Sequence, residues 1–235
     1  GTAQQKLGRH TDAALTFAEF VKKYPSAEQA DECRLRQGQS LLQAKQYTEA
    51  ARLFEALGKL PRFPHADFAL MQQAQCHHEQ GQFAQAAALY EALPGRYASS
   101  RYSGAALVAA GKCWLQAGRA AQAQTILAAV AAQKRPEAAE AAYWLGQTLL
   151  QLDRSAEALA VADRAIAAHP KSEHLPHLSF LRINALQATP ARRKEAPGLY
   201  ARFVLAHPDH ELAPRGAYLA ALSALGVVFS LGIDN

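Results

Sequence analysis

A small residue recurs along this chain at intervals of 35 to 38 residues. Each copy stands in a stretch whose apolar residues have the spacing of one helix face, and large apolar residues follow most copies four and seven positions later. The recurring positions, called anchors below, are Ala13, Ala50, Ala86, Ala123, Ala158 and Ala196. A period of this length predicts a row of similar units that contact mainly their neighbours.

Residues 139–170 show the plan of one unit. Two segments with helical spacing of apolar residues are separated by a turn at residues 153–155, and Pro170 closes the unit. Twelve positions before the anchors, where two helices must approach closely, the chain has mostly small residues. These positions hold Gly38, Ala74, Gly111, Gly146 and Asn184. We therefore expect each unit to be a hairpin of two packed helices.

This arrangement resembles the tetratricopeptide repeat. The pattern of that family has Leu-Gly in the first helix, Gly at the turn, Ala and an aromatic residue in the second helix, and Pro at the end. The matching residues are Leu145 and Gly146, then Gly81, Ala86 and Tyr90, and finally Gly8, Ala13, Phe17 and Pro25. The resemblance implies an all-α fold, a right-handed α-solenoid of antiparallel helix hairpins with about five full repeats and a half repeat at each end.

The repeats predict a single solenoid domain over residues 1–235. Its expected parts are a half repeat at 1–25, repeats at 27–62, 66–98, 103–135, 137–170 and 173–208, and a terminal helix at 210–235. Because the chain opens inside a repeat and without an initiator Met, we expect it to be a fragment of a longer protein. The fifth repeat departs most from the pattern, since Pro197 falls in its second helix, where we place it in the first turn.

Composition supports closely packed helices. Apolar residues make up 50 % of the chain and include many alanines, so we expect no sheet. The formal net charge of +5 is spread along the chain and does not demand a nucleic-acid partner. An RNA-binding helical repeat is one alternative function. Too few aromatic residues are expected on the concave face for base stacking, so we expect no nucleic-acid partner.

The C-terminal stretch suggests a second alternative. Residues 216–233 contain no charged side chain, which reaches only the lower limit of a membrane span. Gly226 and Ser223 weaken that reading, so we expect the first helix of a sixth repeat and no membrane span in this fragment. Because an uncapped solenoid end is adhesive, the chain would then be a structural or self-associating module that forms a homodimer through its open C-terminal end.

No motif for catalysis or metal binding accompanies the repeats. The chain has no Gly-rich phosphate loop and no Gly-x-Ser-x-Gly sequence. The histidine pairs His174 and His177, and His207 and His210, have no Cys-x-x-Cys or His-Glu-x-x-His framework beside them. We therefore expect no enzymatic activity, no cofactor and no metal site, and the three cysteines are expected to be free.

Function is then expected at the concave face, which the first helices of such a solenoid line. Outward-facing polar residues of these helices are Gln39 and Gln43, Gln75 and Glu79, Lys112 and Gln116, and Gln147 and Gln151. Residues eight and fifteen positions before the anchors are Leu42, Met71, His78, Val108, Leu115, Tyr143 and Leu150. This groove predicts a non-catalytic scaffold that binds a peptide or helix of a partner protein. The helix propensity of glutamine is an alternative explanation for the amide ladder.

Two junctions between repeats suggest a compartment. Residues 23–27, Lys-Tyr-Pro-Ser-Ala, and the segment from Ala141 to Gly146 resemble the bacterial envelope subset of the family. That subset comprises periplasmic repeat proteins associated with the Tol-Pal system or with outer-membrane assembly. The resemblance implies a location in the bacterial periplasm or cell envelope and a role within an envelope complex.

Overall fold

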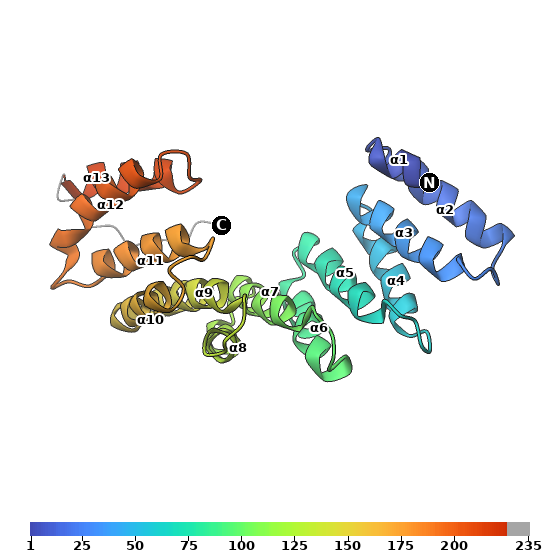
Figure 1. Ribbon diagram of the computed structural model, residues 1–235, viewed down its shortest axis with the longest axis horizontal. Coiled ribbons are helices and arrows are strands. Elements are labelled where there is room, and N and C mark those ends of the chain that lie inside the picture. The colour runs from blue at the N-terminus through green and yellow to red at the C-terminus, as the bar shows by residue number, and fades with distance from the viewer. Residues whose placement is uncertain (225–235) are drawn as a thin grey trace. The chain divides into compact units, whose positions relative to one another are not determined.

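The computed structural model describes residues 1–224, and within that range it consists of helices without any strand (Figure 1). Its helices are α1 (Thr2–Lys6), α2 (His10–Lys23), α3 (Ala30–Gln43), α4 (Tyr47–Gly58), α5 (Ala66–Glu79), α6 (Phe83–Arg96), α7 (Ser103–Gln116), α8 (Ala120–Ala131), α9 (Ala138–Gln151), α10 (Ser155–Ala168), α11 (Leu175–Ala188), η1 (Arg193–Glu195), α12 (Ala196–Ala206) and α13 (Ala213–Ala224). The predicted all-α class, built from helix hairpins, is confirmed.

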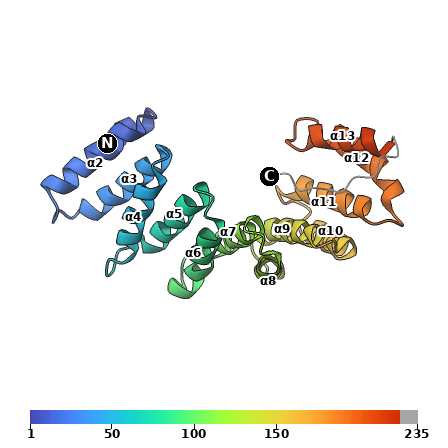
Figure 2. The same ribbon diagram turned by 180° about the vertical axis from the view of Figure 1, so that it is seen from behind.

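The helices group into two compact units. Unit 1, Gly1–Ala117, holds α1 to α7, and unit 2, Gly118–Asn235, holds α8 to α13. Within each unit every helix packs against the next one along the chain, which is the contact pattern of stacked hairpins. Helices α3 and α5 also touch, as do α9 and α11, so first helices of successive hairpins are neighbours (Figure 2). The single domain over residues 1–235 stays a prediction.

The turn inside several hairpins contains one residue with a left-handed backbone, five positions before the anchor. Gly81 has a φ of 71° there, a conformation that glycine adopts easily because it lacks a Cβ. Lys45 and Asp153 adopt the same conformation with φ of 60° and 57°, at a cost of about 1–2 kcal/mol each. The turns therefore share a backbone geometry rather than a residue type.

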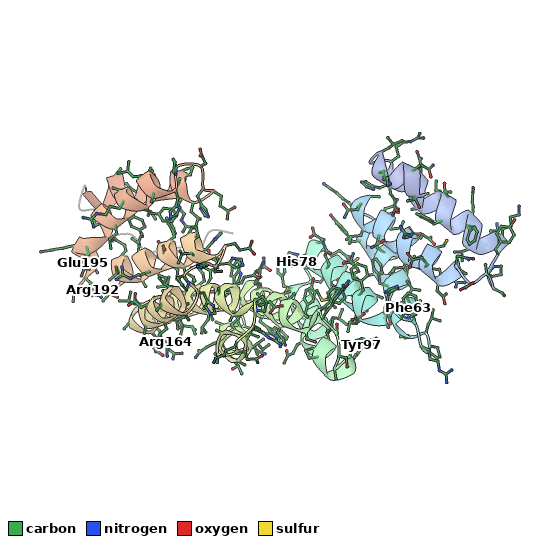
Figure 3. The ribbon with its side chains drawn as sticks, viewed as in Figure 1. Phe63, His78, Tyr97, Arg164, Arg192 and Glu195 are labelled. Atoms are coloured by element: carbon green, nitrogen blue, oxygen red, sulfur yellow. The ribbon has the colours of Figure 1, made fainter. Side chains whose placement is uncertain are left out.

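The fifth hairpin has a longer connection between its helices. After α11 ends at Ala188, η1 fills part of the link before α12 begins. Pro197 lies in the first turn of α12, as predicted, where its missing N–H removes no helical hydrogen bond. The Nε and Nη2 atoms of Arg192 donate to the Glu195 carboxylate at 2.8 Å each and brace the link (Figure 3).

Small residues allow the close helix crossings that the pattern predicts. All six anchor alanines are completely buried. A Cβ added to Gly38 of α3 would lie 2.7 Å from the Phe54 ring of α4. At Gly146 of α9 it would lie 2.2 Å from Cδ2 of Leu181 in α11. Carbon atoms cannot approach this closely in a packed interior, so both glycines are needed for the helices to meet.

A buried hydrogen bond explains the exception among the crossing positions, Asn184. This residue of α11 is only 4 % exposed, and its Oδ1 accepts a hydrogen bond of 2.8 Å from the hydroxyl of Tyr200 in α12. Tyr200 stands four positions after its anchor and is completely buried. A buried hydroxyl needs a partner, which a glycine or alanine side chain at position 184 cannot supply.

The last helix is described only in part. Helix α13 begins at Ala213, and residues 225–235 of the predicted terminal helix lie outside the described residues. The homodimer through this end therefore stays a prediction. Among residues 1–224, no helix combines the length and the hydropathy that a membrane crossing requires.

Candidate functional site

The predicted partner contacts of unit 1 lie on its first helices, α3, α5 and α7. Leu42, Val108 and Leu115 are each less than a tenth exposed, so the structure assigns these three to the packing between helices rather than to an accessible groove. The other predicted residues are exposed or half-buried and define the first-helix face: Gln39, Gln43, Met71, Gln75, His78, Glu79, Lys112 and Gln116. The accessible part of the predicted groove is therefore mainly polar.

A hydrogen bond between successive first helices joins two residues of the first-helix face. His78, labelled in Figure 3, lies on α5. Its Nε2 atom is 3.1 Å from Oε1 of Gln116 in α7. Because an amide oxygen only accepts, this bond requires the proton of the neutral ring to be on Nε2. Helix α1 is joined to α3 in a similar way, since Gln5 Nε2 donates to Ser40 Oγ at 2.8 Å. Polar side chains of neighbouring first helices are therefore within reach of one another.

The predicted contacts of unit 2 lie on α9. Tyr143, Gln147 and Leu150 are half-buried, and Gln151 is exposed. Gln147 Nε2 donates to the Tyr143 hydroxyl at 2.9 Å, so part of its hydrogen-bonding capacity is used within the helix. The Tyr143 ring packs against that of His177 in α11, with 5.3 Å between centroids, and burial raises the pKa of this tyrosine. The structure thus brings Tyr143 and Gln147 together, beside a histidine outside the predicted set.

A cluster of histidines in unit 2 was not predicted from the sequence. The His177 ring lies 4.8 Å from that of His210 and 5.9 Å from that of His174, centroid to centroid. The His207 ring lies 6.3 Å from that of His210, and His177 Nε2 is 2.9 Å from Glu211 Oε1. The sequence signal that could have predicted the cluster is spacing, because His207 and His210 follow His174 and His177 by 33 residues each. Within the described residues, no three His, Cys, Asp or Glu side chains are arranged to hold a metal ion.

Burial, with His177 and His207 nearby, lowers the pKa of His210 below the ordinary value of 6.5. Nδ1 of its ring accepts a hydrogen bond from the backbone N–H of Leu212 at 3.1 Å, which also favours the neutral ring. A hydrogen bond with His177 lowers the pKa of Glu211 as well. As the pH falls, the unfolded chain therefore takes up a proton at His210 before the folded chain does, and this uptake favours unfolding.

The free energy of unfolding is accordingly expected to decrease as the pH falls from about 7.5 to about 5.5. The decrease is steepest between the ordinary value of 6.5, where His210 of the unfolded chain titrates, and its lowered folded-state pKa, and it levels off below the latter. In the His210→Asn variant an amide oxygen replaces the titrating ring as acceptor, so the pH dependence should shrink. Urea unfolding followed by circular dichroism at both pH values measures this. His65→Asn, at an exposed histidine of unit 1, is the control, and equal pH dependence of wild type and His210→Asn would contradict the assignment.

The cysteines offer no reactive thiolate in the described part of the chain. Cys33, Cys76 and Cys113 are all free, as predicted. Burial raises the pKa of Cys76 to about 12 and that of Cys113 to about 11. Because the thiolate is the nucleophile, these two buried thiols are inert at neutral pH and serve as small core residues.

Comparison with solved structures shows the same fold elsewhere. A tetratricopeptide repeat protein from Parabacteroides merdae ATCC 43184 has a TM-score of 0.67 and 16 % identity, covering 84 % of this chain and 74 % of that chain. The TPR-like repeats of a putative kinesin light chain from Podosopora anserina give 0.62 and 17 %, covering 77 % and 97 %. YrrB, described as a TPR protein with an unusual peptide-binding site, gives 0.59 and 14 %, covering 88 % and 100 %. At these identities the likeness concerns the fold alone.

Comparison with family models is more specific. No curated protein matches the sequence. A family model described as tetratricopeptide repeat matches residues 1–61 and 108–173, and a second model with the same description matches residues 41–110. The first of these models alone covers more than half of the chain. Together with the stacked hairpins, these matches show that the chain belongs to the tetratricopeptide repeat family.

Proposed function

We propose that this chain is a non-catalytic protein-interaction scaffold that binds an extended peptide or a helix of a partner protein along the first helices of its hairpins. One observation carries the proposal. Gln39, Gln75 and Lys112 stand at equivalent positions of α3, α5 and α7, and none of them is buried. The hydrogen bond between His78 and Gln116 links the polar faces of α5 and α7.

The chemistry of this surface suits a peptide backbone. A glutamine amide both donates and accepts, so it can bond a peptide N–H and C=O without regard to sequence. Packed helices lie about 8–10 Å apart, and an extended chain advances about 3.3 Å per residue. Every third residue of a bound extended segment would therefore meet the next polar position. Met71 is half-buried and lies one turn before Gln75 on α5, so its apolar side chain would contact side chains of the partner.

Two further observations support the proposal. The chain belongs to a repeat family with a structural relative, YrrB, that is described as having a peptide-binding site. The junction segments at residues 23–27 and 141–146 resemble those of envelope repeat proteins. As part of the same proposal, we place the scaffold in the bacterial periplasm or cell envelope, within a protein complex.

A triple variant tests the proposed surface. Random peptides displayed on phage are selected on the wild-type chain, and synthetic copies of the selected peptides are measured by fluorescence anisotropy. Gln39→Ala/Gln75→Ala/Lys112→Ala is expected to weaken the dominant class of peptides by about tenfold or more, because each lost polar contact removes on the order of 0.5–1.5 kcal/mol. The matched control changes Glu49, Arg52 and Gln85, exposed on second helices, to alanine. Binding within about twofold of wild type for the first variant would refute the first-helix face.

A further inference from the structure

An apolar hollow lies on unit 2. It has a volume of about 350 Å³ and is lined by residues from the ends of α8 and α10 and from the middle of α9. Its lining residues are Ala128, Ala131, Ala132, Ala142, Leu145, Val161, Arg164, Ala165, Ala168 and His169. We call it the α8–α10 hollow. The residues that line it are apolar except for Arg164 and His169.

The next hairpin explains why this hollow exists. Ala142 of α9 and Ala165 of α10 correspond, 38 residues later, to Phe180 of α11 and Phe203 of α12. Those two phenylalanines are buried and pack on each other with 5.1 Å between ring centroids. Because Ala142 and Ala165 are much smaller than phenylalanine, the fourth hairpin leaves open at its surface the space that the two rings fill in the next hairpin.

The other full repeats do not share this pair of alanines. The corresponding pairs are Arg34 with Leu57, Leu70 with Leu93, and Leu107 with Val130. The second helix α10 also carries Ala162 where the neighbouring hairpin has Tyr200. The hollow is therefore a local property of the fourth hairpin and not a general feature of the repeat.

The rim of the hollow is positively charged. Arg164 is exposed, and its Nε donates to the backbone carbonyl of Ala160 on the same helix at 3.2 Å (Figure 3). Its sequence neighbour Asp163 is paired with Arg182 instead, with 2.6 Å between Nε and Oδ1. Among residues 1–224, Arg164 forms no ion pair, so its charge is available to a bound group.

We infer that the α8–α10 hollow receives a large apolar side chain, leucine or aromatic, from a partner protein segment that carries a carboxylate next to it. The apolar side chain occupies the space that the Phe180 and Phe203 rings occupy in the following hairpin. The carboxylate pairs with the Arg164 guanidinium, which binds carboxylates through parallel N–H donors. Side chains that fill a well-packed pocket often supply much of the binding energy of a protein interface.

The experiment fills the hollow by enlarging one of the side chains that line it. Phage-displayed random peptides are selected on wild type and counter-selected on Ala165→Phe, a residue that the next hairpin accommodates at the equivalent position. Peptides specific to wild type are expected to share a leucine or aromatic residue beside Asp or Glu. Their synthetic copies should bind Ala165→Phe and Arg164→Glu about tenfold or more weakly, yet bind Ala167→Leu, an exposed control on the same helix, as wild type does. Circular dichroism and thermal unfolding establish that each variant is folded.

The outcomes separate this site from the first-helix face. Specific peptides should also bind Gln39→Ala/Gln75→Ala/Lys112→Ala normally, because that variant leaves unit 2 unchanged. The inference is overturned if no peptide distinguishes wild type from Ala165→Phe, or if the specific peptides lack an apolar and acidic pair. It is also overturned if sedimentation shows a wild-type dimer that Ala165→Phe dissociates, since the occupant would then be a second copy of the chain.

Discussion

Replacing Asn184 by alanine is expected to lower the free energy of unfolding by about 1–3 kcal/mol. The side chain of Asn184 accepts the hydrogen bond of the Tyr200 hydroxyl, and both residues are buried. Alanine would leave that hydroxyl without a partner in an apolar site, where it also loses its hydration. The effect is expected even though alanine is the residue at the equivalent position of the second full repeat, Ala74.

A double-mutant cycle separates the hydrogen bond from the change in packing. Tyr200→Phe alone removes the donor and should also be destabilising, because it leaves the Asn184 amide oxygen unpaired. In the double variant neither group needs a partner, so its loss of stability should be smaller than the sum of the two single losses by about 1 kcal/mol or more. Urea unfolding followed by circular dichroism provides the four free energies. Strictly additive losses would show that the bond contributes nothing.

Replacing Gly146 by alanine is also expected to destabilise the chain, by about 1–3 kcal/mol. The new methyl group would lie 2.2 Å from Cδ2 and 3.0 Å from Cγ of Leu181. Leu181 is completely buried, so either its side chain must shift within the packed interior or α9 and α11 must move apart. This loss outweighs the gain in helix propensity, which is at most about 1 kcal/mol.

Gly95 provides a matched control for the same chemical change. It also lies within a helix, α6, but a Cβ added there meets nothing within 4 Å. Gly95→Ala should therefore stabilise the chain slightly, by about 0.5–1 kcal/mol, through helix propensity alone. Leu181→Val shortens the opposing side chain. In that background Gly146→Ala should lower the free energy of unfolding by less than it does in the wild type. An equal effect of alanine at positions 146 and 95 would exclude a close crossing at Gly146.

The hairpins themselves could be predicted from the sequence because their determinants are local. The spacing of Ala158, Ala162 and Ala165 places small residues on one stripe of α10, and this period favours a helix through interactions within the segment itself. Pro197 could be placed in the first turn of α12 for the same reason, since proline is compatible with few other helix positions. The crossing at Gly146 also followed from its position in the repeat.

The candidate site could be predicted only in part. Periodicity identifies which residues leave a helix in the same direction, but it does not show how far the neighbouring helix covers them. Leu42, Val108 and Leu115 have the right spacing for the first-helix face, yet the adjacent hairpins bury them. Gln43 and Gln116, which directly follow Leu42 and Leu115 in the chain, remain exposed.

By itself, the sequence determined the repeat, the all-α hairpins and the positions where small residues let helices cross, because each depends on spacing along one helix. Three features were decided only by the tertiary structure. They are the hydrogen bond that accommodates Asn184, the contact of His177 with His210, and the hollow that Ala142 and Ala165 leave beside Arg164. These features depend on side-chain volume and hydrogen bonding across helices that are distant in sequence. The spacing of residues in the sequence shows which side chains share one face of a helix, whereas the burial of those side chains depends on the helix that packs against them.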